Sequence, residues 1–308
     1  MDGFDSQDLT RWTVSGGPTL VAGRIGGSAV KMIDGALLVR YPTTLSTIGF
    51  GVAFKCITNA LNPTVIRLMS GGTNMLILSG STSGWTITYW SISSGVQTPL
   101  TAVTVGNWEH FDILYTSHST TGRVLVKQNG NVVFDFTGNT STYGSVAPID
   151  NVVIAGGYES QYAVDDIWVS TGESYGDSRV RGLVPTADST TAWATSTGTS
   201  HFALVDEIPP SMTDYVSATG GSGLQDKFTL TVPGDLTAVT AVQVNAYGLK
   251  TDAGTAPLRL IADTQESANI GFSTTAGGIS AIFPTAAAGA AWTPAKLAAA
   301  GAVGIKAV

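Results

Sequence analysis

Two groups of acidic residues could take part in glycan hydrolysis, but neither has the required spacing. Retaining glycosidases hold two carboxyl groups about 5 to 5.5 Å apart, and residues i and i+2 of a strand share a face. Glu109 and Asp112 are three positions apart, and Asp165 and Asp166 are adjacent. Each pair is therefore expected to point to opposite faces of its strand. We predict no catalytic acid pair.

Nucleophilic catalysis is also disfavoured by the sequence. A serine or cysteine nucleophile needs a histidine that a carboxylate orients, and we assign no nucleophile elbow. Cys56 continues the apolar alternation of its segment, so we expect it to be a small buried side chain. His110 follows Trp108 at the start of a strand and is expected to be structural, whereas His118 lies in a Ser- and Thr-rich loop. We predict that the chain is not an enzyme.

Calcium is the metal that the sequence leaves open, because one cysteine and three histidines offer little for zinc. Oxygen ligands for calcium could come from Asp165 and Asp166, helped by Asp150 and Asn151. A carboxylate at the start of a strand more often accepts hydrogen bonds from backbone amides. We therefore predict no cofactor, with calcium at Asp165 and Asp166 as the weaker alternative.

Aromatic side chains are the candidates for binding a glycan, because sugar rings stack their apolar faces on flat side chains in shallow sites. Alternation along the segment 85–90 places Trp90 on the face opposite to Trp85 and Tyr89. Three tyrosines lie in Gly- and Ser-rich segments that we interpret as loops. The alternative is that these rings only cover the edges of the sheets. The candidate glycan-binding residues are Trp90, Tyr143, Tyr158 and Tyr162.

The composition limits what the surface can bind. Charged residues make up 12% of the 308 residues, against roughly 25% in typical soluble domains, so Ser, Thr, Asn, Gln and Gly must cover the surface. The formal net charge is −7, which leaves no basic field to hold a phosphate backbone. We expect no nucleic-acid partner, no signal peptide and no membrane insertion.

Short segments of alternating apolar residues must position these candidates. From Ile48 to Cys56 every second residue is apolar, so these residues share one face of a strand. Asn129-Gly130 stands between two such runs and favours a tight hairpin turn. Many short strands without a helical pattern are typical of an antiparallel sandwich. The expected strands are 36–41, 48–56, 65–69, 75–79, 85–92, 108–116, 122–127, 132–136, 151–155, 164–170, 202–205, 226–232, 239–250, 257–262, 269–273 and 302–308.

The length suggests two domains, since domains usually have about 100 to 200 residues. The polar stretch 173–182 lacks alternation and is interpreted as a linker between domains 1–172 and 183–308. Near the C-terminus, Thr293 can cap a short helix, Pro294 suits its first turn and Gly301 can end it. The predicted fold class is therefore all-β, with two antiparallel β-sandwich (jelly-roll) domains and one short helix.

Three motifs follow one another in the first half: Gly106-Asn107-Trp108-Glu109-His110-Phe111, the Asn129-Gly130 hairpin, and Val164-Asp165-Asp166-Ile167-Trp168-Val169. Their order resembles the late strands of the concanavalin A-like, laminin-G-like jelly roll. The resemblance covers residues 1–172. The acidic motif of the glucanase branch, two Glu flanking an Asp at alternate positions, is absent, so the resemblance does not imply hydrolysis.

Four stretches of the second half, 176–180, 205–210, 241–246 and 292–306, carry a further likeness. They are similar to a segment found behind such jelly rolls in tailed-phage virion proteins. This likeness implies a protein of the phage particle that is made in the host cytoplasm without a signal peptide. Several copies are implied as well, with a trimer as the first expectation.

The predicted function is therefore a non-enzymatic structural component of a tailed-phage virion, such as a capsid decoration, a collar or a tail appendage. Its expected partners are other copies of itself and other virion proteins, with host-surface polysaccharide as a further option. A neutral, Thr- and Gly-rich surface suits such contacts, and burial between subunits protects strand edges. One alternative is a host-receptor carbohydrate-binding module of a tail fibre or spike. A third is a polysaccharide hydrolase.

Overall fold

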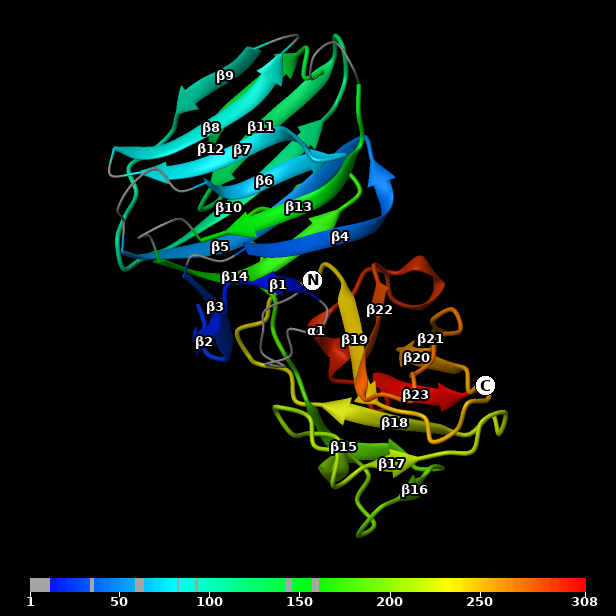
Figure 1. Cartoon of the computed structure of the whole chain (residues 1–308). Coiled ribbons are helices and arrows are strands. Elements are labelled where there is room, and N and C mark those ends of the chain that lie inside the picture. The colour runs from blue at the N-terminus through cyan, green and yellow to red at the C-terminus, as the bar shows by residue number, and fades with distance from the viewer. Residues whose placement is uncertain are drawn as a thin grey trace. The chain divides into compact units, whose positions relative to one another are not determined.

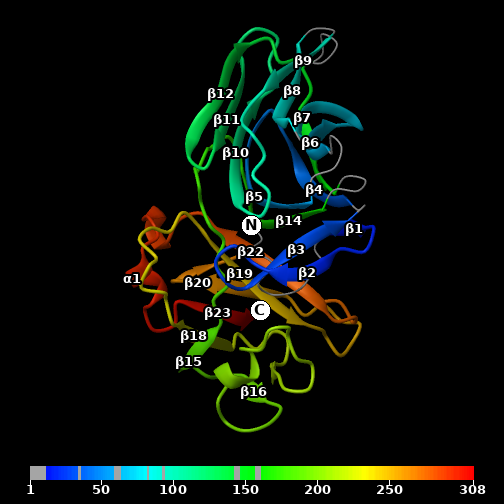
Figure 2. The same ribbon diagram turned by 90° about the vertical axis from the view of Figure 1, so that its left-hand side faces the viewer.

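The computed structural model describes residues 12–33, 36–58, 64–81, 83–91, 94–141, 146–156 and 161–308. The chain divides into two compact units, Met1–Arg181 and Gly182–Val308, which are drawn in Figures 1 and 2. No helix in these described ranges is long and apolar enough to cross a membrane.

The first unit contains two seven-stranded sheets in which every pairing is antiparallel. One sheet has the order β1-β4-β13-β6-β7-β8-β9. Its strands are β1 (Thr13–Ser15), β4 (Ala36–Leu45), β6 (Thr64–Ser70), β7 (Thr73–Ser81), β8 (Gly84–Ser91), β9 (Ser94–Pro99) and β13 (Ile149–Ala155).

The other sheet has the order β12-β11-β10-β5-β14-β3-β2. Its central strand β5 pairs with β10 on one side and with β14 on the other. The strands are β2 (Thr19–Ala22), β3 (Ser28–Ile33), β5 (Thr47–Thr58), β10 (Trp108–Thr116), β11 (Gly122–Gln128), β12 (Asn131–Gly138) and β14 (Gln161–Ser170).

The apolar core lies between these two sheets, which Figure 2 shows as two layers. The expected face of β5 is buried, from Ile48 to Cys56 at every second position. Aromatic contacts join the layers: the ring centroids of Tyr89 on β8 and Phe136 on β12 are 4.8 Å apart. Phe54 on β5 lies 6.2 Å from Trp85 on β8. The predicted antiparallel sandwich is therefore confirmed.

The hairpin between β11 and β12 forms at the predicted residues. Asn129 and Gly130 have φ angles of 50° and 81°, and Gln128 pairs with Asn131 across the turn. Positive φ at both central residues matches the twist of the flanking strands.

The second unit is also antiparallel. A five-stranded sheet has the order β15-β18-β23-β20-β21, and two-stranded pairs form between β16 and β17 and between β19 and β22. The strands are β15 (Pro185–Thr190), β16 (Ala194–Thr195), β17 (Val216–Ser217), β18 (Gln225–Leu230), β19 (Val242–Gly248), β20 (Leu258–Ala262), β21 (Gln265–Glu266), β22 (Gly277–Phe283) and β23 (Val303–Ala307).

Two expected strands of this unit are wrong. Residues 202–205 contain the 3-10 helix η1 (Phe202–Leu204), because the Asp188 carboxylate accepts from the backbone amides of His201 and Phe202 and bends the chain there. Residues 269–273 form a single bridge, between Ile270 and Leu258, and no strand. A second 3-10 helix, η2, spans Ala287–Gly289.

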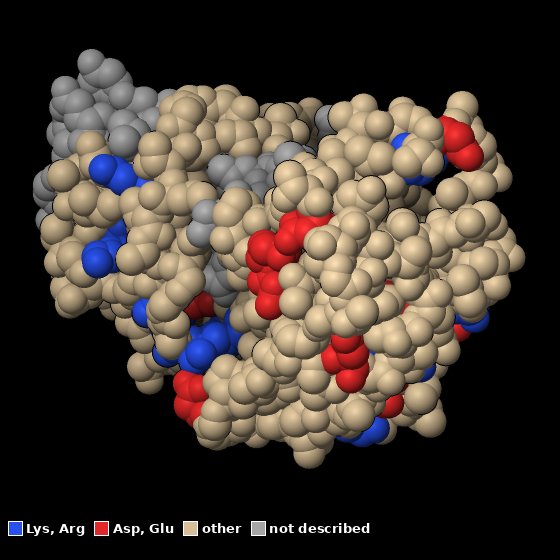
Figure 3. All heavy atoms as spheres, turned by 90° about the horizontal axis from the view of Figure 1, so that it is seen from below, with Lys and Arg blue, Asp and Glu red and all other residues tan. Residues whose placement is uncertain are grey.

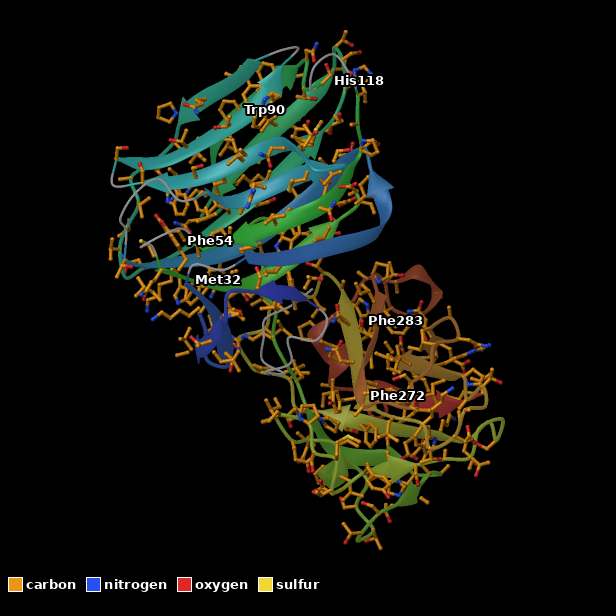
Figure 4. The ribbon with its side chains drawn as sticks, in the orientation of Figure 1. Met32, Phe54, Trp90, His118, Phe272 and Phe283 are labelled. Carbon is orange, nitrogen blue, oxygen red and sulfur yellow. The ribbon has the colours of Figure 1, made fainter. Side chains whose placement is uncertain are left out.

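The short helix near the C-terminus is confirmed as α1 (Pro294–Leu297). The Thr293 hydroxyl accepts from the Lys296 amide at 3.2 Å, as an N-cap residue does. Leu297 is buried beside Trp292 and Phe283 in a small apolar core, and Phe283 is marked in Figure 4. The helix is shorter than the sequence suggests and depends on that core for its stability.

Candidate functional site

The acids of β10 point to opposite faces, as their spacing predicts. Glu109 lies on the core side, where its carboxylate accepts from Trp85 Nε1 at 2.9 Å and from Gln128 Nε2 at 3.0 Å. Asp112 lies on the outer side of the sheet and is 1% exposed. Burial raises the pKa of both carboxyl groups, although the hydrogen bonds oppose the shift. The two acids cannot act on one substrate.

Asp112 is buried because the chain that leaves β14 returns over the outer face of the sheet. We call residues 173–181 the strap. Asp112 Oδ2 accepts from the Ser174 hydroxyl at 2.6 Å and from the Gly176 amide at 2.7 Å. Farther along, Asp166 Oδ1 accepts from the Val180 amide at 2.9 Å. The segment interpreted as a linker is thus held on the first unit by carboxylates.

Small residues of β5 make room under the strap. A Cβ atom on Gly49 would lie 1.8 Å from the Glu173 carbonyl oxygen, and one on Gly51 would lie 2.0 Å from the Trp168 ring. The Trp168 ring in turn lies 5.0 Å from that of Tyr175, between centroids. Side chains larger than hydrogen at these two β5 positions would push the strap away from the sheet.

An ion cluster lies beside these contacts. Arg24 NH1 is 2.7 Å from Asp177 Oδ1 and 3.3 Å from Asp166 Oδ2. His110 is fully buried, and its Nδ1 lies 3.9 Å from Asp177 Oδ1. Burial, with the nearby charges of Arg24 and Arg179, lowers the pKa of His110 to about 4 although Asp177 opposes the shift. His110 is therefore neutral near pH 7, and its two buried ring nitrogens have no hydrogen-bond partner within the described residues.

The two aspartates proposed as calcium ligands are occupied by donors of the chain itself. Asp165 accepts from the Arg24 amide at 2.8 Å and from the Asp166 amide at 2.8 Å. Asp166 accepts from the Val180 amide and from the Arg24 guanidinium, which supplies the positive charge at this point. Within the described ranges, no three His, Cys, Asp or Glu side chains are grouped to hold a metal ion.

Sequence reasoning missed a match to the Gly-x-Ser-x-Gly pattern. It runs from Gly172 through Ser174 to Gly176, so the sequence does contain the pattern of a nucleophile elbow, which we did not assign. A nucleophile elbow requires a turn between a strand and a helix, whereas no helix follows Ser174 in the strap. Its hydroxyl donates to Asp112 and accepts from Lys127 Nζ at 2.8 Å. Ser174 therefore fastens the strap.

Of the four aromatic candidates, Trp90 has the predicted orientation. Trp90 is half-buried on β8 (Figure 4) and pairs with Gly95 of β9, which has no side chain to cover the ring. Tyr162 was expected in a loop, which is wrong: it lies on β14, is fully buried and packs on Phe54 at 6.4 Å between ring centroids. Tyr143 and Tyr158 lie outside the described residues.

The remaining residues considered for catalysis have structural roles. Cys56 is buried, as predicted, and burial raises the pKa of its thiol. His118, labelled in Figure 4, is exposed in its loop, and its Nδ1 accepts from the amides of Thr120 at 3.1 Å and Thr121 at 3.0 Å.

A second histidine–carboxylate pair, in the second unit, was also missed. His201 Nδ1 lies 2.6 Å from Asp226 Oδ2, and both residues are buried. The other oxygen of Asp226 accepts from the amides of Ala192 at 2.7 Å and Trp193 at 2.9 Å. These bonds tie β18 to two loops. The sequence contains no local signal for them, because the partners are far apart along the chain.

Comparison with known proteins identifies structural likeness only. No protein-family model and no curated protein matches the chain. A cellulose-induced protein, Cip1, is 16% identical, with 58% of this chain and 97% of that chain covered and a TM-score of 0.43. Domain 4 of AbnA, a GH43 extracellular arabinanase from Geobacillus stearothermophilus, is 15% identical over 55% of this chain and 90% of that one, with a TM-score of 0.42. The binding domain of botulinum neurotoxin DC is 10% identical over 53% of this chain and 43% of that one, with a TM-score of 0.41. Sequence identities and TM-scores this low do not allow a function to be inferred from these proteins.

Proposed function

We propose that this chain is a non-enzymatic structural component of a tailed-phage virion. The non-enzymatic part of this proposal is supported by the hydrogen bonds of the residues that could have been catalytic. Glu109, Asp112, Asp165, Asp166 and Ser174 are each engaged by donors or acceptors of the chain itself. The virion context is supported by the resemblance of the second half to phage particle proteins.

The surface supports a contact function. On the face seen in Figure 3, charged side chains form small separate groups among other residues. Several large apolar side chains are exposed, including Val132 on the edge strand β12 (58% exposed) and Ile282 on β22 (55% exposed). Burial of such side chains and strand edges between subunits would stabilise an assembly. A trimer remains our proposal for its smallest form.

Mass spectrometry of purified particles tests the proposal. We expect the chain in virions at a fixed ratio to the major capsid protein, and absence from virions would overturn the structural role. Analytical ultracentrifugation of the isolated chain tests the trimer. The variant Ile282→Lys should lower the fraction of assembled protein if β22 lies in a subunit contact, with Asp252→Ala as an exposed control that leaves assembly unchanged.

Glycan recognition at Trp90 is the second candidate function, because this ring faces outward across from Gly95. A glycan array should then show binding that Trp90→Ala abolishes and that Tyr247→Ala, an exposed aromatic control, retains. No binding by the wild-type chain to any bacterial surface glycan would remove this candidate. Release of reducing ends from a capsule, lost in Glu109→Gln or Asp112→Asn, would instead support the hydrolase alternative.

A further inference from the structure

A shallow hollow lies in the second unit, between the chain that follows β19 and the chain that flanks β20. Its volume is about 470 Å³. Pro257, Ile270 and Phe272 give it an apolar floor, and the polar lining side chains include Lys250 and Asn269. Clefts with an apolar lining and a few placed polar groups are the usual form of a small-molecule site.

The walls of the hollow are fixed by backbone hydrogen bonds. Ile270 and Leu258 exchange two bonds, at 2.9 Å and 2.6 Å between nitrogen and oxygen. The Lys250 amide donates to the Ser273 carbonyl at 3.0 Å, and the Val308 amide donates to the Pro257 carbonyl at 2.9 Å. A ligand would therefore meet a preformed surface and would not have to order these segments.

The Phe272 ring offers a flat apolar surface in this hollow. Phe272 is half-buried, and a Cβ atom on Gly248 would lie 3.1 Å from its Cε2 and Cζ atoms. The ring thus rests against backbone that has no side chain at that point. The apolar C–H face of a pyranose ring is a suitable partner for such a surface.

Lys250 supplies the charge of the hollow. Its ammonium donates to the Gly254 carbonyl at 2.6 Å, which leaves two of its three donors. None of the described residues that line the hollow is acidic. The neighbouring cations differ in this respect, because Arg259 and Lys306 both pair with Glu266, at 2.8 Å and 2.7 Å.

Asn269 adds an oriented hydrogen-bond donor beside this charge. Its Oδ1 accepts from Arg259 Nε at 2.8 Å, so the amide is oriented with its NH₂ group left for a ligand oxygen. An ammonium and an amide donor beside an aromatic ring select a ligand that has both a carboxylate and hydroxyl groups on a ring.

We propose that this hollow binds a carboxylated sugar, such as a uronic or sialic acid residue. The ring of the sugar lies on Phe272, and its carboxylate pairs with Lys250. This inference concerns the second unit, is distinct from recognition at Trp90 and does not depend on the proposed virion role.

NMR titration of the full ¹⁵N-labelled chain tests the proposal. The probes are trigalacturonate and sialyllactose, each compared with its carboxyl methyl ester, which keeps the ring and removes the charge. At sugar concentrations of about 10 mM, which detect the weak binding expected of an open site, the amides of Gly271 and Phe272 should shift with at least one acid. That acid should bind about threefold to tenfold more tightly than its ester, the range for one solvent-exposed ion pair with a hydrogen bond.

Variants assign the effect to residues. Lys250→Met should make acid and ester bind equally, and Phe272→Leu should weaken both. Lys31→Met, in the first unit, is the matched control and should keep the wild-type preference. The proposal is overturned if no amide of the hollow moves with either acid, if acid and ester bind the wild type equally, or if Lys250→Met keeps the preference. Unchanged spectra away from the hollow verify that each variant is folded.

Discussion

Removal of the Asp112 carboxylate should release the strap from the first unit. This carboxylate accepts from Ser174 and Gly176, and a hydrogen bond to a charged group contributes about 1.5 to 3 kcal/mol. Burial of Asp112, which raises its pKa, offsets part of the sum. For Asp112→Ala we expect the free energy of local opening to fall by about 3 kcal/mol, which corresponds to roughly a 100-fold larger open population.

Trypsin provides the assay, because Arg179 and Arg181 lie within the strap. Cleavage in the native state follows the population of the open form when reclosing is fast, so cutting after these arginines should accelerate about 100-fold. The products would end and begin near the boundary between the two units. Asp135→Ala is the control: its pair with Arg123 is exposed, and cleavage should change by no more than about twofold.

If folded Asp112→Ala is cut at the wild-type rate, this carboxylate does not hold the strap on the first unit. Hydrogen exchange separates local opening from global unfolding. The Gly176 amide should lose protection in the variant, whereas the amide of Val126, in the interior strand β11, should keep it. Equal loss at both amides would mean that Asp112 supports the whole sandwich and not the strap alone.

Three further outcomes are expected. Burial lowers the pKa of His110 from 6.5 to about 4. The fold is therefore fully stabilised by neutral His110 above pH 6.5, and this contribution is lost as the pH falls toward 4. In urea titrations of His110→Gln, the free energy of unfolding should fall less over that pH range, by up to about 3 kcal/mol. Gly51→Val should lower stability by about 1 to 3 kcal/mol and change the near-UV circular dichroism, because its Cβ would meet Trp168 at 2.0 Å. Asp226→Ala should destabilise the second unit by about 2 to 4 kcal/mol in calorimetry, since it removes the acceptor of buried His201 and of the partly buried amides of Ala192 and Trp193. The exposed Asp252→Ala should stay within about 0.5 kcal/mol.

The features that the sequence predicts correctly depend on local backbone geometry. Alternation alone places the apolar residues from Ile48 to Cys56 on one face and sends Glu109 and Asp112 to opposite faces. The Asn129-Gly130 turn and the Thr293 cap follow from the conformations that these residue types favour. Such features need no knowledge of the partner strands.

The features that sequence reasoning misses depend on partners that are distant in the chain. Ser174 and Asp112 are separated by 62 residues, and Arg24 and Asp165 by 141. No periodic pattern encodes such pairs. The position of Tyr162 depends on distant partners as well. The sequence predicts a strand that begins at residue 164, whereas β14 begins at Gln161 and so includes Tyr162, whose ring lies in the core.

The burial of acidic side chains in both units also lowers the charge of the surface. At least five of the 22 acidic residues, Glu109, Asp112, Asp165, Asp166 and Asp226, are buried, so the exposed charge is lower than the composition alone implies.

A buried carboxylate is a poor source of stability compared with an apolar side chain of the same size, but it accepts from specific amides and so selects one register. If the residues under the strap were apolar, residues 173–181 could pack on them in several registers. Asp112 accepts from Gly176, and Asp166 accepts from Val180, so a shift of the strap by one residue would break both bonds. We therefore expect Asp112→Leu with Asp166→Leu to leave the sandwich folded while the strap amides show several conformations by NMR. A single set of strap resonances in that double variant would show that the register of the strap does not depend on these two carboxylates, and that the remaining contacts, such as the Arg24–Asp177 pair and the packing on Gly49 and Gly51, determine it.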